Sequence, residues 1–331
     1  MKFFQFIGTQ RSGSNLLRLM LNQLKGIYAP HPPHILKTFY PLIPKYGNLN
    51  SSNNFEFLID DILSWIKLNP IKWKNIPTKN QILERVDFKS LFQIFKSVYE
   101  INAEADSKLK YWCCKSLYNL NFYENESFKD LKPIYIYIYR DGRDVSSSFM
   151  KAPIGEKHIY FLSKKWYEDQ MMSLKIKDTS SSENFFSIKY EDLLSNPELI
   201  LKNFCDKYSI DYNDNILNFY KSDDSISASS SGKLWKNLSR PLIKNNKEKY
   251  INDLTNNDIL LFESINHSYL KLLGYKLNFK EKSYLTSFLQ DDIDKFAILN
   301  NRLKDKLLSN ISSKELLNRE KQLKLLKQLK N

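Results

Sequence analysis

The stretch MKFFQFIGTQRSGSNLLRLMLNQ (residues 1–23) joins a short apolar segment, a polar turn and a leucine-rich segment in direct succession. Lys2 to Ile7 is aromatic and apolar like a buried strand, whereas leucine and methionine recur at helical spacing from Leu16 to Leu24. The sequence therefore predicts a strand, a tight turn and a helix. Unpaired N–H groups and the helix dipole attract anions at a helix N-terminus, so the turn predicts a phosphate-binding site.

The turn differs from an ATP-binding P-loop. Its G-x-x-x-x-G spacing ends at Gly13, but Ser14 and Asn15 follow where the P-loop has Lys and then Ser or Thr. The cation lies inside the turn, as Arg11, with Ser12 and Ser14 as neutral donors, and Ser14 is the predicted N-cap of the helix. Magnesium-ATP chemistry is disfavoured, because that chemistry needs the missing lysine and the hydroxyl that holds magnesium.

Composition limits the classes of protein that fit. The chain has 331 residues, 42% apolar and 14% aromatic, which is enough for a large core. Its 50 Lys and Arg against 37 Asp and Glu give a net charge of +13, which suits a polyanionic ligand or reflects a general lysine bias. No dense basic block, zinc spacing or RNA-binding aromatic motif indicates a nucleic-acid partner.

Cysteine usage and hydropathy indicate a cytoplasmic protein. Cys113, Cys114 and Cys205 are odd in number and two are adjacent, which predicts neither a disulfide framework nor a metal site. Too few residues precede the first turn for a signal peptide, and no apolar run approaches the roughly 18 residues that a membrane span needs. We expect a reducing compartment and no metal.

Short apolar strands alternate with long helical stretches along the chain. This alternation predicts an α/β fold: a three-layer parallel sheet flanked by helices, with ligands at the carboxyl ends of the strands. The predicted strands are Phe3–Ile7, Tyr111–Cys114, Pro133–Tyr139 and Phe185–Ile188. The predicted helices include Phe55–Leu68, Phe88–Val98, Ile159–Lys175 and Asp258–Leu273.

The second half of the chain contains less regular segments. The serine-rich stretch Ser222–Lys233 is predicted to be a mobile loop that orders over a ligand, and Tyr275–Tyr284 is predicted to form a hairpin. We place the main domain at residues 1–280 and a charged, leucine-rich helical tail at 281–331.

The tail has the sequence features of a helix. A capping-box pattern at Ser312 and Glu315 precedes a series of leucines. These leucines either pack within their own chain or pair with a second copy as a short coiled coil, which would make the protein a homo-oligomer.

A second anion site is predicted after the strand PIYIYIY (residues 133–139). The next residues, RDGRDVSSSF, again form a turn with glycine and arginine and then a serine-rich helix start. Arg140 can clamp a phosphate with its guanidinium while Ser148 donates from the side of the helix. Alternatively, Arg140 and Arg143 only form a surface ion network with the aspartates beside them. Two anion loops in one sheet would suit a ligand that carries phosphate at both ends.

At this point the sequence resembles a known family. RSGS (11–14), YRDGRDVSSSF (139–149), IKYEDLLSNPE (188–198) and SGKLWKNLSRPL (231–242) followed by LKLLGY are similar to segments of sulfotransferases that use 3′-phosphoadenosine 5′-phosphosulfate (PAPS). The resemblance spans about residues 3–276, in the order of the family, and implies a P-loop-like sulfotransferase fold.

The resemblance implies a role for each segment. Arg11 would stabilise charge on the bridging oxygen of PAPS, and the neighbouring Ser12, Gly13, Ser14 and Asn15 would hold the 5′-phosphosulfate. Arg140 and Ser148 would bind the 3′-phosphate. A late basic loop would close over the same phosphate through Ser231, Gly232, Lys233 and Lys236, although the family commonly has Arg-Lys-Gly where this chain has Ser-Gly-Lys.

The transfer also needs a general base for the acceptor hydroxyl. The segment GIYAPHPPHILK (26–37) offers His31 and His34 in a stiff proline turn, and His31 is the better placed of the two. His158 is an alternative that could face the acceptor, whereas His267 lies on a predicted helix and is expected to be structural. Lys115, at the end of the second predicted strand, is either a surface lysine or a residue near the transferred group.

The favoured function is transfer of the sulfuryl group from PAPS to a hydroxyl acceptor, a carbohydrate or a small alcohol, without a metal ion. Two other classes stay open. A P-loop kinase that acts on a small hydroxyl compound would require magnesium and turn over ATP. A non-catalytic nucleotide-binding module, whose tail mediates its interactions, would bind PAPS without transferring sulfate.

Overall fold

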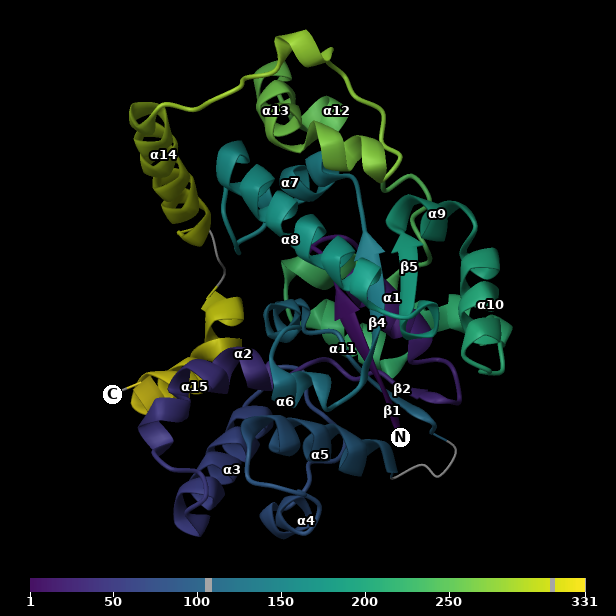
Figure 1. Cartoon of the computed structure of the whole chain (residues 1–331), viewed down its shortest axis with the longest axis vertical. Helices are drawn as coiled ribbons and strands as arrows, with labels where there is room; N and C mark the ends of the chain where they lie inside the picture. The colour runs from purple at the N-terminus through teal and green to yellow at the C-terminus, as the bar shows by residue number, and fades with distance from the viewer. Residues whose placement is uncertain (105–108, 310–312, 331) are drawn as a thin grey trace.

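The computed structural model describes residues 1–104, 109–309 and 313–330, without the side chains of residues 233–234 and 313–319. Its centre is one five-stranded sheet in which every paired strand is parallel, in the order β2-β3-β1-β4-β5 (Figure 1). The strands are β1 Lys2–Ile7, β2 Ile27–Tyr28, β3 Tyr111–Cys114, β4 Pro133–Tyr139 and β5 Phe185–Lys189. The predicted parallel α/β sheet is confirmed. The sequence missed β2, because two residues are too short for a periodic pattern.

Helices cover both faces of the sheet. The α-helices of the first half are α1 Ser14–Leu21, α2 Ile35–Phe39, α3 Ser52–Lys67, α4 Lys79–Leu83, α5 Leu91–Glu104, α6 Glu126–Lys129, α7 Gly142–Met150 and α8 Ile159–Thr179. Those of the second half are α9 Tyr190–Ser195, α10 Pro197–Lys207, α11 Asp223–Ser230, α12 Tyr250–Asp253, α13 Asn256–Leu272, α14 Gln290–Leu308 and α15 Ser313–Lys330. Short 3₁₀ helices are η1 Tyr40–Tyr46, η2 Leu117–Phe122, η3 Ser182–Asn184, η4 Asp214–Lys221, η5 Lys233–Ser239 and η6 Glu281–Ser283.

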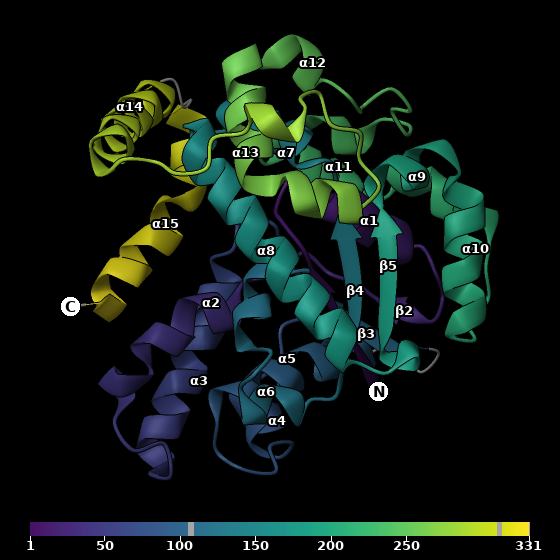
Figure 2. The same ribbon diagram turned by 45° about the horizontal axis from the view of Figure 1, so that its top comes forward.

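The alternation of side chains along β1 divides the core into two. Phe3 and Ile7 face one side and pack in a large cluster with residues of α3, α5 and α8. Phe4 and Phe6 face the other side and pack with residues of α1 and α10. In Figure 2, α8 crosses one face of the sheet diagonally. Because β3 and β4 are buried on both faces, their sequences read as continuous apolar runs.

Three local expectations need correction. The stretch predicted as a mobile serine-rich loop contains α11, whose N-cap Ser222 accepts a hydrogen bond from the N–H of Ser225. The segment 275–284 forms no strand; the buried carboxylate of Glu263 accepts its backbone N–H groups at Asn278 and Phe279 instead. The N-cap of α1 is Gly13, and its left-handed backbone replaces the expected serine cap.

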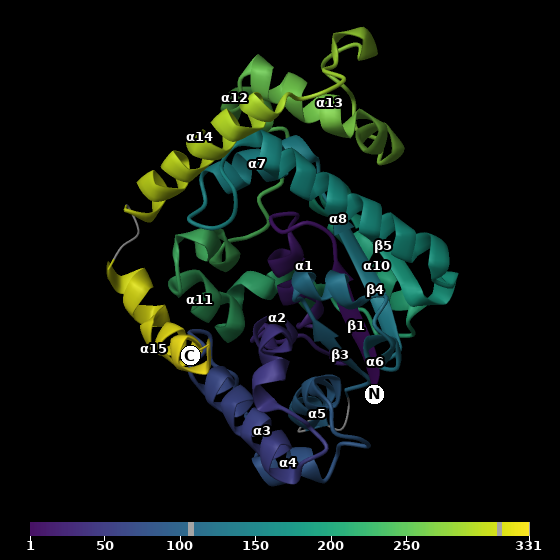
Figure 3. The ribbon, with the colours of Figure 1, turned by 60° about the vertical axis from the view of Figure 1, so that its left-hand side comes forward.

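The C-terminal tail is helical, as predicted. Leu325, Leu326 and Leu329 of α15 pack against the large core cluster of their own chain. Figure 3 shows α14 and α15 along one side of the molecule, leading from α7 towards α3. Ser312 of the predicted capping box and the side chain of Glu315 lie outside the described residues. Within the described ranges, no helix is both long and apolar enough to cross a membrane.

We predict that Gly142→Ala lowers the free energy of unfolding by about 1–3 kcal/mol, because overpacking a core forces its neighbours to move. A Cβ atom at Gly142 would lie 2.3 Å from the ring of Phe262 and 2.7 Å from the ring of Trp166. The matched control is Gly26→Ala, where the nearest atom, in Ile210, is 3.6 Å away. Urea denaturation measures both, and equal stability of the two variants would contradict this account of the α7 start.

Candidate functional site

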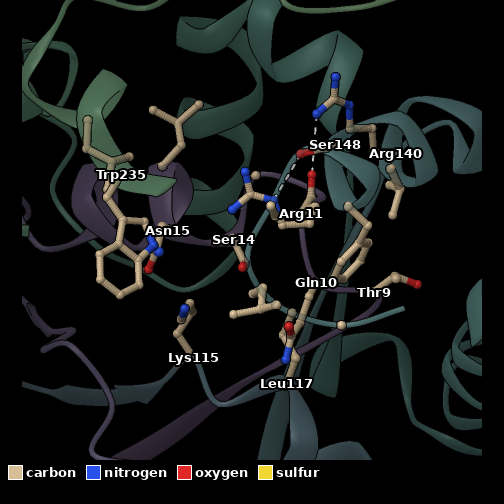
Figure 4. Close-up of a pocket in the computed structure, with 18 of the residues that line it drawn as sticks. Thr9, Gln10, Arg11, Ser14, Asn15, Lys115, Leu117, Arg140, Ser148 and Trp235 are labelled. Carbon is tan, nitrogen blue, oxygen red and sulfur yellow. Dashed lines mark hydrogen bonds between the residues drawn. The ribbon is translucent and has the colours of Figure 1, made fainter. Parts of the chain in front are cut away.

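A cavity of about 1110 Å³ opens at the carboxyl ends of β1, β3 and β4, where parallel sheets bind their ligands. Most of the residues predicted to act on a ligand line it. They are Arg11, Gly13, Ser14, Asn15, His31, His34, Arg140, Ser148 and Ser231. Figure 4 shows Arg11 in the centre, with Arg140 and Ser148 on one side of it and Lys115 and Trp235 on the other.

The first turn depends on two glycines. Gly8 has φ +118°, and a Cβ there would lie 2.3 Å from the carbonyl oxygen of Ile138. Gly13 has φ +91°, and a Cβ there would lie 2.3 Å from the ring of Tyr190. Only glycine fits such a close approach with positive φ. Arg11 also has positive φ, at 73°, as often occurs where the surroundings hold a functional residue in a strained backbone.

Arg11 joins the two predicted anion sites. Its Nε donates a hydrogen bond of 3.0 Å to the Oγ of Ser148, which lies 137 residues further along the chain on α7. Burial and the nearby cation of Arg140 lower the pKa of Arg11. No ion pair between Arg11 and a carboxylate occurs in the described part of the chain, so its charge is available to an anion from solvent.

The two arginines of the second turn have different surroundings. Arg143 forms ion pairs of 2.6 Å with both Asp141 and the buried Glu263, so it is part of the structural frame. Arg140 forms one ion pair, 3.0 Å to Asp144, and its guanidinium lies 4.7 Å from the centre of the Tyr190 ring. The expected alternative of an ion network therefore describes Arg143 well, although that network is buried rather than on the surface.

Several buried polar atoms of the two turns have no hydrogen-bond partner among the described residues. They are the Oγ of Ser12, the Oδ1 of Asn15 and the Nε of Arg140. Leaving a buried polar atom unpaired costs about 1–3 kcal/mol, so such atoms are usually satisfied by a bound molecule or water. Asn15 and Arg140 line the cavity together with Arg11, which has no carboxylate partner in the described part of the chain, and this indicates a site for an anion. Ser12 is buried beneath the turn and is not among the described lining residues.

Lys115 directly follows β3 and lines the same cavity. Burial, with the cations of Arg18 and Arg11 nearby, lowers the pKa of Lys115 to about 7. A strongly shifted pKa in a cleft is typical of functional sites. This side chain is only partly exposed, so the interpretation as an ordinary surface lysine does not fit.

Hydrogen bonds to neighbouring elements hold the segment that carries His31 and His34 in place. The indole N–H groups of Trp73 and Trp65 donate to the carbonyl oxygens of His31 and Pro33, each at 2.7 Å. The Nδ1 of His34 lies 2.9 Å from the Oγ of Ser116. The ring of His31 instead meets the ring of Trp235 edge-on, with 5.6 Å between centres.

Ser116 is itself held in place. It is buried at the end of β3, and its carbonyl oxygen accepts a hydrogen bond of 3.1 Å from the Nε2 of Gln5 on β1. The amide of Asn119 completes this group by donating to Gln5. The hydroxyl that contacts His34 is therefore attached to the rigid centre of the sheet.

The other two histidines have structural contacts. The Nδ1 of His158 accepts the N–H of Tyr160 as the N-cap of α8, and its ring stacks on Phe296 at 4.5 Å. His267 stacks on Tyr284 at 4.9 Å, as expected for a structural residue.

The predicted late basic loop, residues 231–236, reaches the site only in part. Ser231 and Trp235 line the cavity, whereas Gly232 and Lys236 are not among its described lining residues and the side chain of Lys233 lies outside the description. Ser231 donates its hydroxyl to the carbonyl of Ala228.

An ion pair missed by sequence reasoning holds this late segment against α1. Arg18 is fully buried and donates to Asp224 of α11 at 2.5 Å and to the carbonyl of Ala29 at 2.9 Å. The sequence feature that could have revealed this ion pair is a single arginine, Arg18, among the leucines of α1. Among the described residues, no group of three or more His, Cys, Asp or Glu side chains could hold a metal.

The fold and the site together define an α/β protein with a P-loop-like turn and a second strand–turn–helix unit beside it. The sequence profile of the sulfotransferase family matches residues 5–214, and the chain belongs to this family. A comparison with curated proteins gave no match.

Solved structures agree with the fold. The chain is similar to the sulfotransferase domain from the curacin biosynthetic pathway, with a TM-score of 0.56 and 18% identity over 84% of this chain and 99% of that one. It is also similar to the sulfotransferase domain from the olefin synthase of Synechococcus PCC 7002, with a TM-score of 0.54 and 19% identity over 83% of this chain and 96% of that one.

We predict that Lys115 is acetylated by acetic anhydride with a midpoint near pH 7, because only the neutral amine reacts and its pKa is lowered to about 7. Below that pH the amine is protonated and unreactive. An ordinary lysine, with a pKa of about 10.4, keeps gaining reactivity up to about pH 10. Mass spectrometry of peptides from samples labelled between pH 5 and 10 measures each site. A Lys115 rate that still rises above pH 9 would contradict the shift.

Proposed function

We propose that this protein transfers the sulfuryl group from PAPS to the hydroxyl of a neutral acceptor, a carbohydrate or a small alcohol. The observation that carries the proposal is the hydrogen bond between Arg11 and Ser148, which joins two anion-binding turns into one site. The two turns suit a donor with phosphate at both ends. Membership of the sulfotransferase family supports the same reaction class.

The residues of the site fit the donor. The first turn would hold the 5′-phosphosulfate with the N–H groups of the α1 N-terminus, Ser14 and the buried polar atoms of Ser12 and Asn15 that lack partners among the described residues. Arg140 and Ser148 would hold the 3′-phosphate. From the late segment, Ser231 is positioned to contribute, and we assign Gly232, Lys233 and Lys236 to closure over the same phosphate.

The reaction is an in-line displacement. The acceptor oxygen attacks the sulfur, the bond from sulfur to the 5′-phosphate oxygen breaks, and the acceptor proton passes to a base. Negative charge develops on the leaving oxygen, and a prearranged cation there stabilises the transition state. Arg11 and Lys115 are the cations for this role. Donors of this kind suffice for a sulfuryl group, so the proposed reaction uses no metal.

A histidine of the 31–34 turn is the proposed base. A base works best when its second ring nitrogen is held by another group, which fixes the tautomer and the ring orientation. The contact of 2.9 Å between His34 and Ser116 supplies such a group. We therefore propose His34 as the base and keep His31, which the sequence favoured, as the alternative in the same turn.

The competing functions have less support. A kinase would need the lysine and the magnesium-binding hydroxyl that the first turn lacks. A non-catalytic module would not explain a lysine with a pKa near 7 beside two histidines in one cavity. Cys113, Cys114 and Cys205 are free and buried, in keeping with the proposed cytoplasmic location. Incubation with radiolabelled PAPS and panels of carbohydrates, alcohols and phenols tests the transfer directly.

Ser148→Ala and Arg140→Ala should weaken binding of 3′,5′-diphosphoadenosine more than binding of adenosine 5′-phosphosulfate, which lacks the 3′-phosphate. The loss of one charged hydrogen bond should cost about 1.5–3 kcal/mol, a reduction of roughly 10- to 150-fold in affinity. Calorimetry measures both ligands. Ser229→Ala, whose hydroxyl bonds only within α11, is the control and should bind both normally. Equal losses for the two ligands would place the 3′-phosphate elsewhere.

His34→Ala should lower the transfer rate about 10²- to 10⁴-fold while PAPS binding stays normal, because proton removal contributes about that much. The parent rate should rise with pH as the base loses its proton, and this rise should vanish in the variant. Ser116→Ala should keep the rise but lower the rate, and Ser116→Thr should restore it. His31→Ala is the comparison; a larger loss there than at position 34 would reverse the assignment.

A further inference from the structure

The C-terminal helices α14 and α15 lie beyond the matched family region, yet they contribute to the cavity. Leu307, near the end of α14, and Gln322, in the middle of α15, both line it. In Figure 3 the two helices extend along the side of the molecule between α7 and α3. The part of the chain that the proposed reaction does not use is thus in contact with the site.

The first helix of the tail is fastened to the loop that follows α7. Asn300 is buried, and its Oδ1 accepts the backbone N–H groups of Lys157 at 2.7 Å and His158 at 3.0 Å. Glu156 in the same loop forms an ion pair of 2.5 Å with Lys304. This loop lines the cavity and continues from the helix that carries Ser148.

The second helix is fastened to the histidine segment. Gln322 is only 4% exposed, and its Nε2 donates to the carbonyl oxygen of Trp65 at 3.3 Å. The indole of Trp65 donates in turn to the carbonyl of Pro33, next to His34. Gln322 is therefore two hydrogen bonds away from the turn that holds the proposed base.

The volume of the cavity lies slightly above the usual range for one small ligand. Sites for a single small ligand measure about 300–1,000 Å³, and this one measures about 1110 Å³. The surface contributed by α3, η2 and the tail is formed by aromatic, amide and aliphatic groups: Trp65, Tyr118, Asn121, Leu307 and Gln322. Lys37, which also lines the cavity, lies over the Tyr118 ring at 5.7 Å.

We propose that α14 and α15 form one wall of the acceptor site, and that Gln322 and Leu307 select extended, uncharged acceptors of the size of an oligosaccharide. Aromatic rings and amides are the groups that contact sugar rings and hydroxyls without requiring charge. The proposal rests on the proposed function, because it assigns the acceptor of that reaction. It also gives the tail a role within its own chain.

A glycoside length series tests the wall. The acceptors are 4-nitrophenyl glucoside, maltoside and maltotrioside, with radiolabelled PAPS as donor. Gln322→Ala should raise the KM for the trisaccharide at least fivefold relative to that for the monosaccharide, with kcat nearly unchanged. Gln328→Ala, on the exposed side of the same helix, is the matched control. Leu307→Ser and the exposed Leu308→Ser form a second pair with the same expected contrast.

A second measurement does not depend on turnover. Because the three native cysteines are buried, Leu307→Cys, at a half-buried position in the cavity lining, and Gln328→Cys, at an exposed position, can be labelled selectively with fluorescein maleimide. The label at position 307 should abolish calorimetric binding of 4-nitrophenyl maltotrioside to the complex with 3′,5′-diphosphoadenosine, whereas the label at 328 should not. Thermal unfolding confirms that each variant is folded.

The outcomes separate the two proposals. An unchanged length preference in both Gln322→Ala and Leu307→Ser, or retained maltotrioside binding in the conjugate at 307, contradicts the proposed acceptor wall. All variants should bind 3′,5′-diphosphoadenosine within twofold of the parent, because neither Gln322 nor Leu307 belongs to the two anion turns. Failure of the parent itself to bind that nucleotide counts against the proposed function instead.

Discussion

The parallel pairing of β1 with β4 is the constraint on which the site depends. Ile7 lies beside Tyr137, so both strands end at the same edge of the sheet and each leads directly into a turn and a helix. The approach is so close that a Cβ at Gly8 would lie 2.3 Å from the carbonyl of Ile138. Two turns that are about 130 residues apart in sequence thus meet, and the hydrogen bond from Arg11 to Ser148 follows from that geometry.

This arrangement brings several positive charges together in a buried site, which is electrostatically unfavourable. Ion pairs around the second turn offset part of that cost. Arg143 is fully paired with Asp141 and Glu263, which also accepts N–H groups of the segment after α13, so one buried network anchors the second turn. Arg11 and Lys115, by contrast, have no carboxylate partner among the described residues, and burial lowers the pKa of both. The two cations repel each other in a site of low dielectric constant. A bound anion would neutralise this repulsion, so the site favours anion binding.

Much of the fold was predictable, because buried strands of four to seven residues and long amphipathic helices leave clear periodic patterns. The strands Tyr111–Cys114 and Pro133–Tyr139 have the predicted bounds. The Arg11 and Arg140 turns were visible because each follows a strand directly. The contacts of Gln322 and Asp224 were not predictable, because they join residues more than 200 positions apart and depend on tertiary packing rather than local pattern. The helix α11 was missed because its many serines are typical of loops, yet a Ser222 cap and burial of Ala228 stabilise it.

The parts of the cavity that we assign to the donor and to the acceptor are built in different ways. The donor half uses turns at the ends of adjacent strands, which the hydrogen bonds of the sheet hold rigidly, and a rigid frame suits a ligand whose charges need fixed partners. The half bounded by α3 and the tail is built from helices packed through side chains, such as Gln322 against Trp65. Side-chain packing changes with few substitutions, whereas a β1–β4 register cannot shift without moving every residue to the other face. Chains with this fold can therefore keep a constant donor site while the proposed acceptor wall differs between them.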